Sequence, residues 1–218
     1  MIEPFVAFFD VETQARIDDM PGNRRDDKIK RLPISCASVL TTPLRWCLDP
    51  VHRERAMEES RMRTFWVDGQ GGTSLDAMCS LLGSSSMIVG YNVFGFDWPV
   101  TRKYFNQQTE FERCREVTHD VFSRVRDVSG VWFKLDALLK ANNLDTKSAD
   151  GLQAIEWWDQ GNRADLQQYC ELDVTQLAKL SLLPTMLLPG GRSLNNHVHG
   201  VQSALASLRA ALNFEQVA

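Results

Sequence analysis

The order of strand-like and helix-like segments predicts an α/β fold. Apolar and β-branched stretches typical of strands occupy residues 5–9, 33–41, 64–67, 87–90 and 114–121. Strands come first, strands mixed with helices follow, and helices alone fill the last part, which favours one α/β domain with a helical C-terminal half. The first and fourth stretches carry no charged residue, so we expect both to be buried strands at the centre of the sheet.

The composition is that of an ordinary soluble globular protein. Of the 218 residues, 44% are hydrophobic and 24% are charged, and no apolar run approaches the length needed to cross a bilayer. No basic segment followed by an apolar one precedes the first strand, so we expect no secretory signal peptide and no membrane partner. The five cysteines lack C-x-x-C spacing, which argues against a zinc site or a disulfide framework and favours reduced thiols in an intracellular compartment, cytoplasm or nucleus.

The net charge of −4 argues against a protein that coats DNA through a uniformly basic surface. It does not exclude nucleic acid as a partner, because a carboxylate–metal site contributes acidic residues that the metal neutralises. Binding of nucleic acid would then be local or weak.

Helical periodicity marks most of the remaining segments. One helix, capped by Thr73 or Ser74, should bury a single apolar face, made of Leu75, Met78, Cys79 and Leu82. Further helices are expected at residues 95–105, 132–142, 150–158, 163–183 and 197–212.

Two charged stretches interrupt this pattern. Residues 14–31 contain the turn signal Pro21-Gly22-Asn23 and a cluster of charges, and we expect an exposed loop or extended hairpin. A basic arm that touches phosphates is the alternative. Residues 44–63 are expected to be irregular, with a short surface helix from about Arg53 to Arg63.

Asp10 and Glu12 follow the first apolar strand and are separated by one apolar residue. Side chains two apart in an extended chain point to the same face, so the two carboxylates should project together. Two carboxylates this close repel one another unless a cation lies between them, and hard divalent cations such as Mg²⁺ or Mn²⁺ prefer oxygen ligands. The alternative is a strand-end turn residue beside a solvated charge.

Asp97 lies at a predicted helix start after the fourth strand, five residues beyond Asn92. If the fourth strand pairs with the first, Asp97 faces Asp10 and Glu12 across the end of the sheet. The alternative is that Asp97 only caps its own helix.

Tyr169 and Asp173 are four residues apart and share one helix face. That face also carries Leu166, Leu177 and Leu180, so Asp173 points towards the core, where a carboxylate needs a partner or a metal. The alternative is a satisfied buried aspartate beside a core tyrosine.

Taken together, D-x-E on the first strand, N-x4-D after the fourth and Y-x3-D on a late helix resemble the DEDD superfamily of 3′–5′ exonucleases. These enzymes have an RNase H-like (DnaQ-like) fold, so a mixed sheet of about five strands flanked by helices is implied. Tyr169 resembles the tyrosine of the DEDDy subclass, whereas the position of the histidine in the other subclass is Gln168. Residues 134–180 look like predicted exonucleases related to the proofreading domain of family B DNA polymerases.

The resemblance implies a metal-dependent 3′–5′ exonuclease that releases nucleoside 5′-monophosphates from single-stranded DNA, with RNA as a possible substrate. Two divalent cations, Mg²⁺ or Mn²⁺, would be held by four carboxylates, those of Asp10, Glu12, Asp97 and Asp173. Asp10 would bridge the ions, Asp97 would hold one of them through water, and Tyr169 would orient the attacking water.

Three further side chains, Thr13, Asn92 and Phe96, would contact the terminal nucleotides, although a core role is the alternative for Phe96. The exonuclease domain would span residues 1–183, and residues 184–218 would form a helical extension packed on it. Two alternatives remain open. One is an endonuclease or resolvase of the same fold, which would lack the tyrosine, and the other is a catalytically weak adaptor that binds nucleic acid or protein.

Overall fold

The computed structural model describes residues 3–48, 53–146 and 151–195 of the chain. The segments 14–31 and 44–63 are therefore visible for the most part. The helix expected at residues 197–212 lies outside the described residues.

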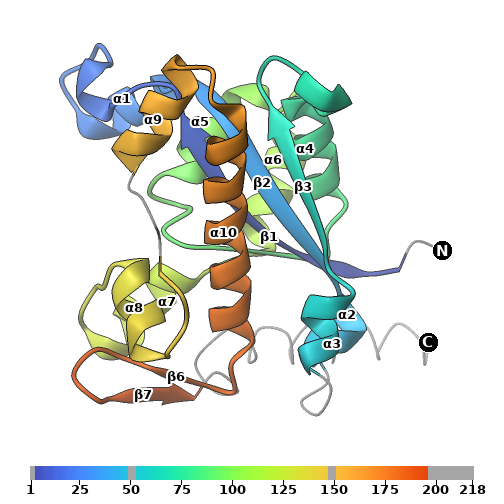
Figure 1. Cartoon of the computed structure of the whole chain (residues 1–218), viewed down its shortest axis with the longest axis vertical. Helices are drawn as coiled ribbons and strands as arrows, with labels where there is room; N and C mark the ends of the chain where they lie inside the picture. Colours follow the sequence, from blue (N-terminus) through green and yellow to red (C-terminus); the bar gives the residue numbers. More distant parts are fainter. Residues whose placement is uncertain (1–2, 49–52, 147–150, 196–218) are drawn as a thin grey trace.

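A five-stranded mixed sheet forms the centre of the molecule (Figure 1). Its strands are β1 (Phe5–Thr13), β2 (Ile34–Pro43), β3 (Arg61–Trp66), β4 (Met87–Gly90) and β5 (Thr118–Asp120), in the order β3-β2-β1-β4-β5. The pairings of β2 with β1 and β3 are antiparallel, and those of β4 with β1 and β5 are parallel. The strand that carries Asp10 and Glu12 is thus central, and β4 lies beside it, as the sequence predicts.

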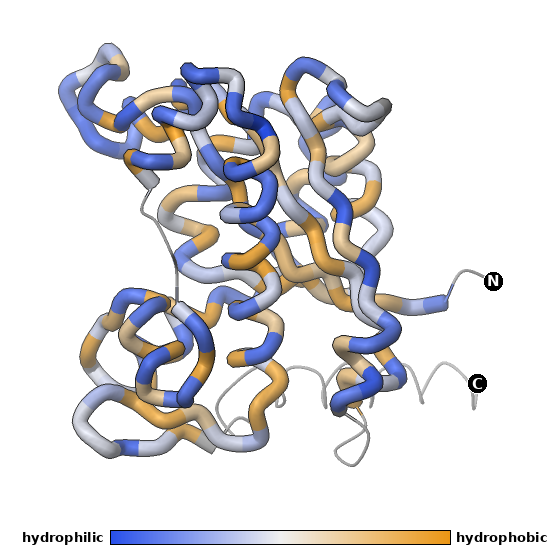
Figure 2. The backbone as a smooth tube through the Cα atoms, viewed as in Figure 1, coloured by the Kyte–Doolittle hydropathy of each residue, from blue (hydrophilic) through white to orange (hydrophobic). Residues whose placement is uncertain are grey.

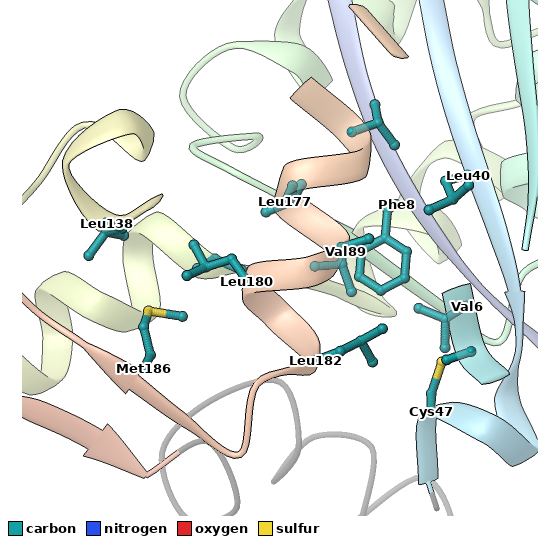
Figure 3. Packing of buried hydrophobic residues seen from close by; sticks show 14 of the residues in the cluster. Val6, Phe8, Leu40, Cys47, Val89, Leu138, Leu177, Leu180, Leu182 and Met186 are labelled. Atoms are coloured by element: carbon teal, nitrogen blue, oxygen red, sulfur yellow. The ribbon is translucent and has the colours of Figure 1, made fainter. Parts of the chain in front are cut away.

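The two faces of β1 bury alternate residues in separate cores. Val6 and Phe8 pack under α10 (Arg163–Leu182), as Figure 3 shows. Ala7 and Phe9 point to the other face, and all four side chains are fully buried. This burial on both sides explains why the approach to Asp10 contains no polar residue.

Helices cover both faces of the sheet. The first face carries α10 together with α2 (Leu44–Leu48), α7 (Val121–Ser129) and α8 (Leu135–Ala141). The second face carries four helices, α1 (Arg25–Arg31), α4 (Leu75–Gly83), α5 (Asp97–Thr101) and α6 (Gln108–Glu116). The remaining helices are α3 (Arg53–Glu58) and α9 (Gly151–Asp159), and α9 packs on α10 and β1.

The expectation of a loop or hairpin at residues 14–31 is wrong for its second half, which forms α1. Figure 2 shows this segment as mostly hydrophilic, yet Ile29 is buried and packs on the second face of the sheet. One apolar residue within seven gives little periodicity, so burial on the sheet, rather than pattern, accounts for the helix. The helices α6 and α7 were also not predicted, and the strand expected at residues 114–121 is reduced to β5.

The first part of the C-terminal segment is a hairpin of β6 (Thr185–Leu187) and β7 (Ser193–Asn195) instead of a helix. Gly190 and Gly191 make the turn with φ of 93° and 86°, a conformation that suits glycine. Met186 is buried in the core of the first face, so this hairpin packs on the same domain.

None of the described helices combines the length and the apolar character needed to cross a membrane. The five cysteines are all buried as free thiols.

Candidate active site

Asp10 and Glu12 lie near the end of β1, paired with Ser38 and Cys36 of β2. Both continue the alternation that places Phe8 on the first face, so both face α10. A carboxylate oxygen from each and the Sγ atom of Cys170 lie within 4.8 Å of one another. The structure therefore brings the two carboxylates together, as the i, i+2 spacing predicts.

Helix α10 supplies Tyr169 and Cys170 to the same region. The Cys170 thiol donates to the backbone carbonyl of Asp10 over 3.7 Å, which holds the helix against the strand. Tyr169 is buried and packs edge-on against Trp157 of α9, with ring centroids 5.9 Å apart. Asp173 lies one helical turn farther along and is only 4% exposed.

Asp97 begins α5 and reaches back to the central strand. Its Oδ1 atom accepts a hydrogen bond from the backbone N–H of Val11 at 3.2 Å, between Asp10 and Glu12 in sequence. Asp97 is the first residue of α5 and not its N-cap, a position that Phe96 occupies. Burial first, and then the negative charge of Asp10, hold the pKa of Asp97 well above its usual range.

The residues of the loop from Gly90 to Asp97 pack closely against one another. Asn92 has a left-handed φ of 60°, and a Cβ atom at Gly95 would lie 2.5 Å from the Asn92 side-chain oxygen. The loop is tied down by Asp120, whose carboxylate accepts the backbone N–H groups of Asn92 at 2.8 Å and Phe94 at 3.3 Å. The same carboxylate caps α7.

Sequence reasoning missed Asp120. The available signal was an aspartate at a junction from a strand to a helix, where a cap residue is common. Nothing in the sequence indicates that the same carboxylate also holds a loop 28 residues away.

A cleft with a volume of about 530 Å³ opens over these residues. Seven of the eight predicted site residues line it, namely Asp10, Glu12, Thr13, Asn92, Phe96, Asp97 and Tyr169. Asp173 does not line the cleft and lies buried on α10. Phe96, for which a core role was the alternative, is half-buried and packs on the core of the second face while it also lines the cleft.

A further part of the cleft wall comes from residues 132–136, where the helix predicted from residue 132 begins only at Leu135. Trp132 is 63% exposed at the rim. The Tyr91 hydroxyl donates to the carbonyl of Phe133 at 2.6 Å and fixes this wall. Asp136 also lines the cleft, and its Oδ1 atom is buried without a hydrogen-bond partner among the described residues.

The donor set suits a hard divalent cation. Carboxylate oxygens are the ligands that Mg²⁺ and Mn²⁺ prefer, and those of Asp10 and Glu12 lie close together here. Burial, and then the neighbouring Cys36 thiol, raise the pKa of Cys170. Cys170 therefore remains a thiol, which makes it a poor ligand for such an ion.

The RNase H superfamily model matches residues 56–183, which is more than half of the chain. The chain belongs to the RNase H superfamily. The matched region contains Asp97, Tyr169 and Asp173, and the central strand β1 precedes it. The mixed sheet of five strands between helices confirms the RNase H-like fold that the resemblance implies.

Among solved structures, this RNase H superfamily chain is similar to exonuclease I. One such structure has 16% sequence identity and a TM-score of 0.44, and the match covers 81% of this chain and 41% of that chain. A second, E. coli exonuclease I in complex with a 5cy-dT13 oligonucleotide, has 17% identity and a TM-score of 0.42, with 77% and 42% coverage. The chain thus spans about two fifths of the length of these proteins. No curated protein sequence matches the chain.

Proposed function

We propose that this protein is a 3′–5′ exonuclease of the DEDDy class that acts on single-stranded DNA and depends on divalent metal ions. The observation that carries the proposal is the convergence of Asp10, Glu12, Asp97 and Tyr169, from three separate elements, on one cleft. Membership of the RNase H superfamily supports it. The relationship to the proofreading domain of family B DNA polymerases is part of the same proposal.

Four carboxylates would hold two ions, Mg²⁺ or Mn²⁺, with Asp10, Glu12 and Asp97 at the cleft and Asp173 behind them on α10. When bound, such ions lower the pKa of a water molecule and stabilise charge on the leaving oxygen. Burial, and then the charge of Asp10, raise the pKa of Asp97, and positive charge in the cleft would favour its ionised form.

In this proposal, Tyr169 would orient the attacking water. Its ring is held by Trp157 and its side chain borders the cleft beside the carboxylates. An unperturbed phenol titrates near 10, so its role is a hydrogen bond to water rather than removal of a proton. The scissile bond is the terminal phosphodiester, and the product is a nucleoside 5′-monophosphate.

The rim of the cleft suits unpaired bases. Trp132 is exposed there, and Phe96 and Phe122 also line the cleft. Aromatic side chains stack on any base, so they bind a single strand with little sequence preference. This wall would receive the 3′-terminal nucleotides.

The test is Mn²⁺-dependent cleavage of a single strand that carries a 5′ label to report shortening and, in a second substrate, a labelled 3′-terminal nucleotide to report mononucleotide release. The wild type should shorten the strand stepwise from its 3′ end, and Asp10→Asn should not. Asp127→Asn, the same change at an exposed position of α7, should leave cleavage intact. RNA and duplex DNA are run in parallel to define the substrate.

Binding of the strand without any cleavage by the wild type would overturn the proposal and favour an adaptor role. Internal cuts without mononucleotides would instead indicate an endonuclease of the same fold.

A further inference from the structure

A second cavity, of about 600 Å³, lies among α1, α5 and α6, whose buried residues pack on the second face of the sheet. Four cationic side chains line it, those of Lys30, Arg102, Lys103 and Arg115, and none of the described lining residues is acidic. Phe94 and Phe111 are among its aromatic lining residues. We refer to this cavity as the basic pocket.

Aromatic rings hold the two guanidinium groups of the basic pocket. Arg102 lies 5.1 Å and Arg115 lies 5.8 Å from the ring centroid of Phe111, and Arg115 also lies 5.6 Å from that of Phe94. Such contacts orient a guanidinium group without neutralising it. Arg102 also donates to the Phe105 carbonyl at 3.4 Å and to the Gln108 side chain, and neither acceptor is charged, so its positive charge is not neutralised.

The acidic neighbours of the pocket compensate this charge only in part. Arg115 pairs with Glu112 at 3.5 Å and Lys30 with Asp27 at 4.0 Å, and the side chains in both pairs are at least 44% exposed. Exposed pairs of this kind contribute little and exchange readily for a stronger anionic ligand.

The basic pocket and the candidate active site are lined by residues of the same loop. Phe94 is 38% exposed and lies in the loop between Asn92 and Phe96. Those two residues line the cleft, whereas Phe94 lines the basic pocket. One short loop therefore borders both cavities, and a chain leaving the cleft across this loop would meet Phe94 first.

We propose that the basic pocket binds the sugar–phosphate backbone and one base of the single strand whose 3′ end occupies the cleft. The inference rests on the proposed function and adds a second contact to it, outside the cleft. Arginine binds phosphate oxygens in a bidentate fork, and Phe94 offers a face for stacking. An acidic peptide would use the cations but not the exposed ring, so nucleic acid is the better fit.

The test measures binding of the full chain to labelled oligo(dT) by fluorescence anisotropy in EDTA, where no cleavage occurs. A strand of about three nucleotides occupies only the cleft, whereas one of about twelve can reach the basic pocket. The variant Lys30→Gln/Arg115→Gln removes two exposed cations from the pocket. The control Arg61→Gln/Arg63→Gln removes two exposed arginines from β3, the strand at the far edge of the sheet.

The pocket variant should bind the long strand about tenfold more weakly, and the salt dependence of log K should fall by about 0.7 for each phosphate that the protein no longer neutralises. Phe94→Ala should weaken long-strand binding about fivefold or more, because alanine offers no ring on which a base can stack. Both variants should bind the short strand, and cleave it with Mn²⁺, as the wild type does. The control should match the wild type in every assay.

Unchanged long-strand affinity in the pocket variants, or an equal loss in the control, would overturn the inference. So would tight binding of a poly-Glu peptide that depends on Lys30 and Arg115 while oligo(dT) binding does not, which would assign the pocket to an acidic protein. Because binding is measured without metal, a wild type that never cleaves but binds the long strand through the pocket would refute the exonuclease and leave this inference standing.

Discussion

At the scale of single residues, Asp97 links the fold to the candidate chemistry. Its carboxylate is bound to the backbone of β1 at Val11, beside the two carboxylates that face α10. Burial and the charge of Asp10 raise its pKa, so the group is held where its ionised form is unfavourable without a cation. Crowded carboxylates of this kind are a feature of functional sites more than of structural ones.

Removal of the Tyr169 hydroxyl distinguishes a role in positioning water from a role in binding metal. Tyr169→Phe should lower single-turnover cleavage at saturating Mn²⁺ by about 10²-fold or more, as removal of a positioning group typically does. Metal affinity measured by calorimetry should hardly change, because the carboxylates remain. Phenylalanine keeps the contact with Trp157, and a melting temperature far below that of the wild type would assign the hydroxyl to a structural hydrogen bond instead. A wild-type cleavage rate would make Tyr169 a core residue only.

His119 predicts a distinct pH dependence of stability. It lies on β5, and burial, and then the charge of Arg124, lower its pKa from 6.5 to about 4. The unfolded chain binds a proton at higher pH than the folded one does, so stability falls as pH drops through this window. Between about pH 7 and pH 5, we expect the free energy of unfolding to fall by about 2 kcal/mol through this residue.

Urea unfolding in EDTA checks this, with His119→Gln as the comparison. The variant should lose less stability than the wild type over the same pH range. Parallel curves for the two proteins would show that His119 titrates normally in the folded state.

Some site residues could be predicted from the sequence and others could not, and the reason is physical. The sequence predicts that Asp10 and Glu12 share one face of a strand, because side chains alternate between the two faces of a strand. It likewise predicts that Tyr169 and Asp173 share one face of a helix, because residues four apart lie one turn apart. Asp120 and Trp132 could not be predicted, because their roles depend on contacts between distant parts of the chain. The Asp120 carboxylate holds a loop far away in sequence, and the Trp132 ring lies at the rim of the cleft.

At the scale of elements, the loop from Gly90 to Asp97 depends on Asp120. Asp120→Asn replaces an ionised acceptor of several N–H bonds with an amide whose NH₂ group cannot accept. We expect the free energy of unfolding to fall by about 1.5–3 kcal/mol, the range for hydrogen bonds to a charged group. Cleavage should also slow, because the loop that ends at Asp97 loses its anchor.

The measurement combines urea unfolding with single-turnover cleavage, and Asp127→Asn, at an exposed position on α7, serves as the matched control. Reduced stability with full activity would show that Asp120 supports α7 alone.

Elements with a strong local pattern were predicted well. Helix α4 begins after Ser74, whose hydroxyl accepts from Ala77 at 3.2 Å, and its buried residues are the four expected from the sequence. Helix α6 was missed because most of its residues are charged or polar, and only Phe111 and Cys114 reach the core. Its helical state comes from packing, which periodicity does not record.

At the scale of the whole molecule, the central position of β1 determines how the site is assembled. Elements from distant parts of the sequence meet at one end of the sheet: β1 and α5 bring carboxylates there, and α10 adds Tyr169 and Cys170 beside them. An ion bound between them would link these elements in the folded state and would have no equivalent in the unfolded chain. Metal binding should therefore stabilise the whole domain.

Thermal melting with and without Mn²⁺ tests this coupling. At a metal concentration about 100 times the dissociation constant, binding adds about 2.7 kcal/mol of stability. For a domain of this size, that corresponds to a rise in Tm of about 5–10 °C. Asp10→Asn should abolish the rise, because it removes a carboxylate common to the cluster.

Adding metal should reverse the order of the melting temperatures of the wild type and Asp10→Asn. In EDTA, Asp10→Asn should melt at or above the wild-type temperature, because it removes the charge that raises the pKa of Asp97. With Mn²⁺, the wild type should melt higher. A variant that melts well below the wild type in EDTA would mean that Asp10 stabilises the fold through its hydrogen bonds, and equal shifts with Mn²⁺ in both proteins would place the ion elsewhere.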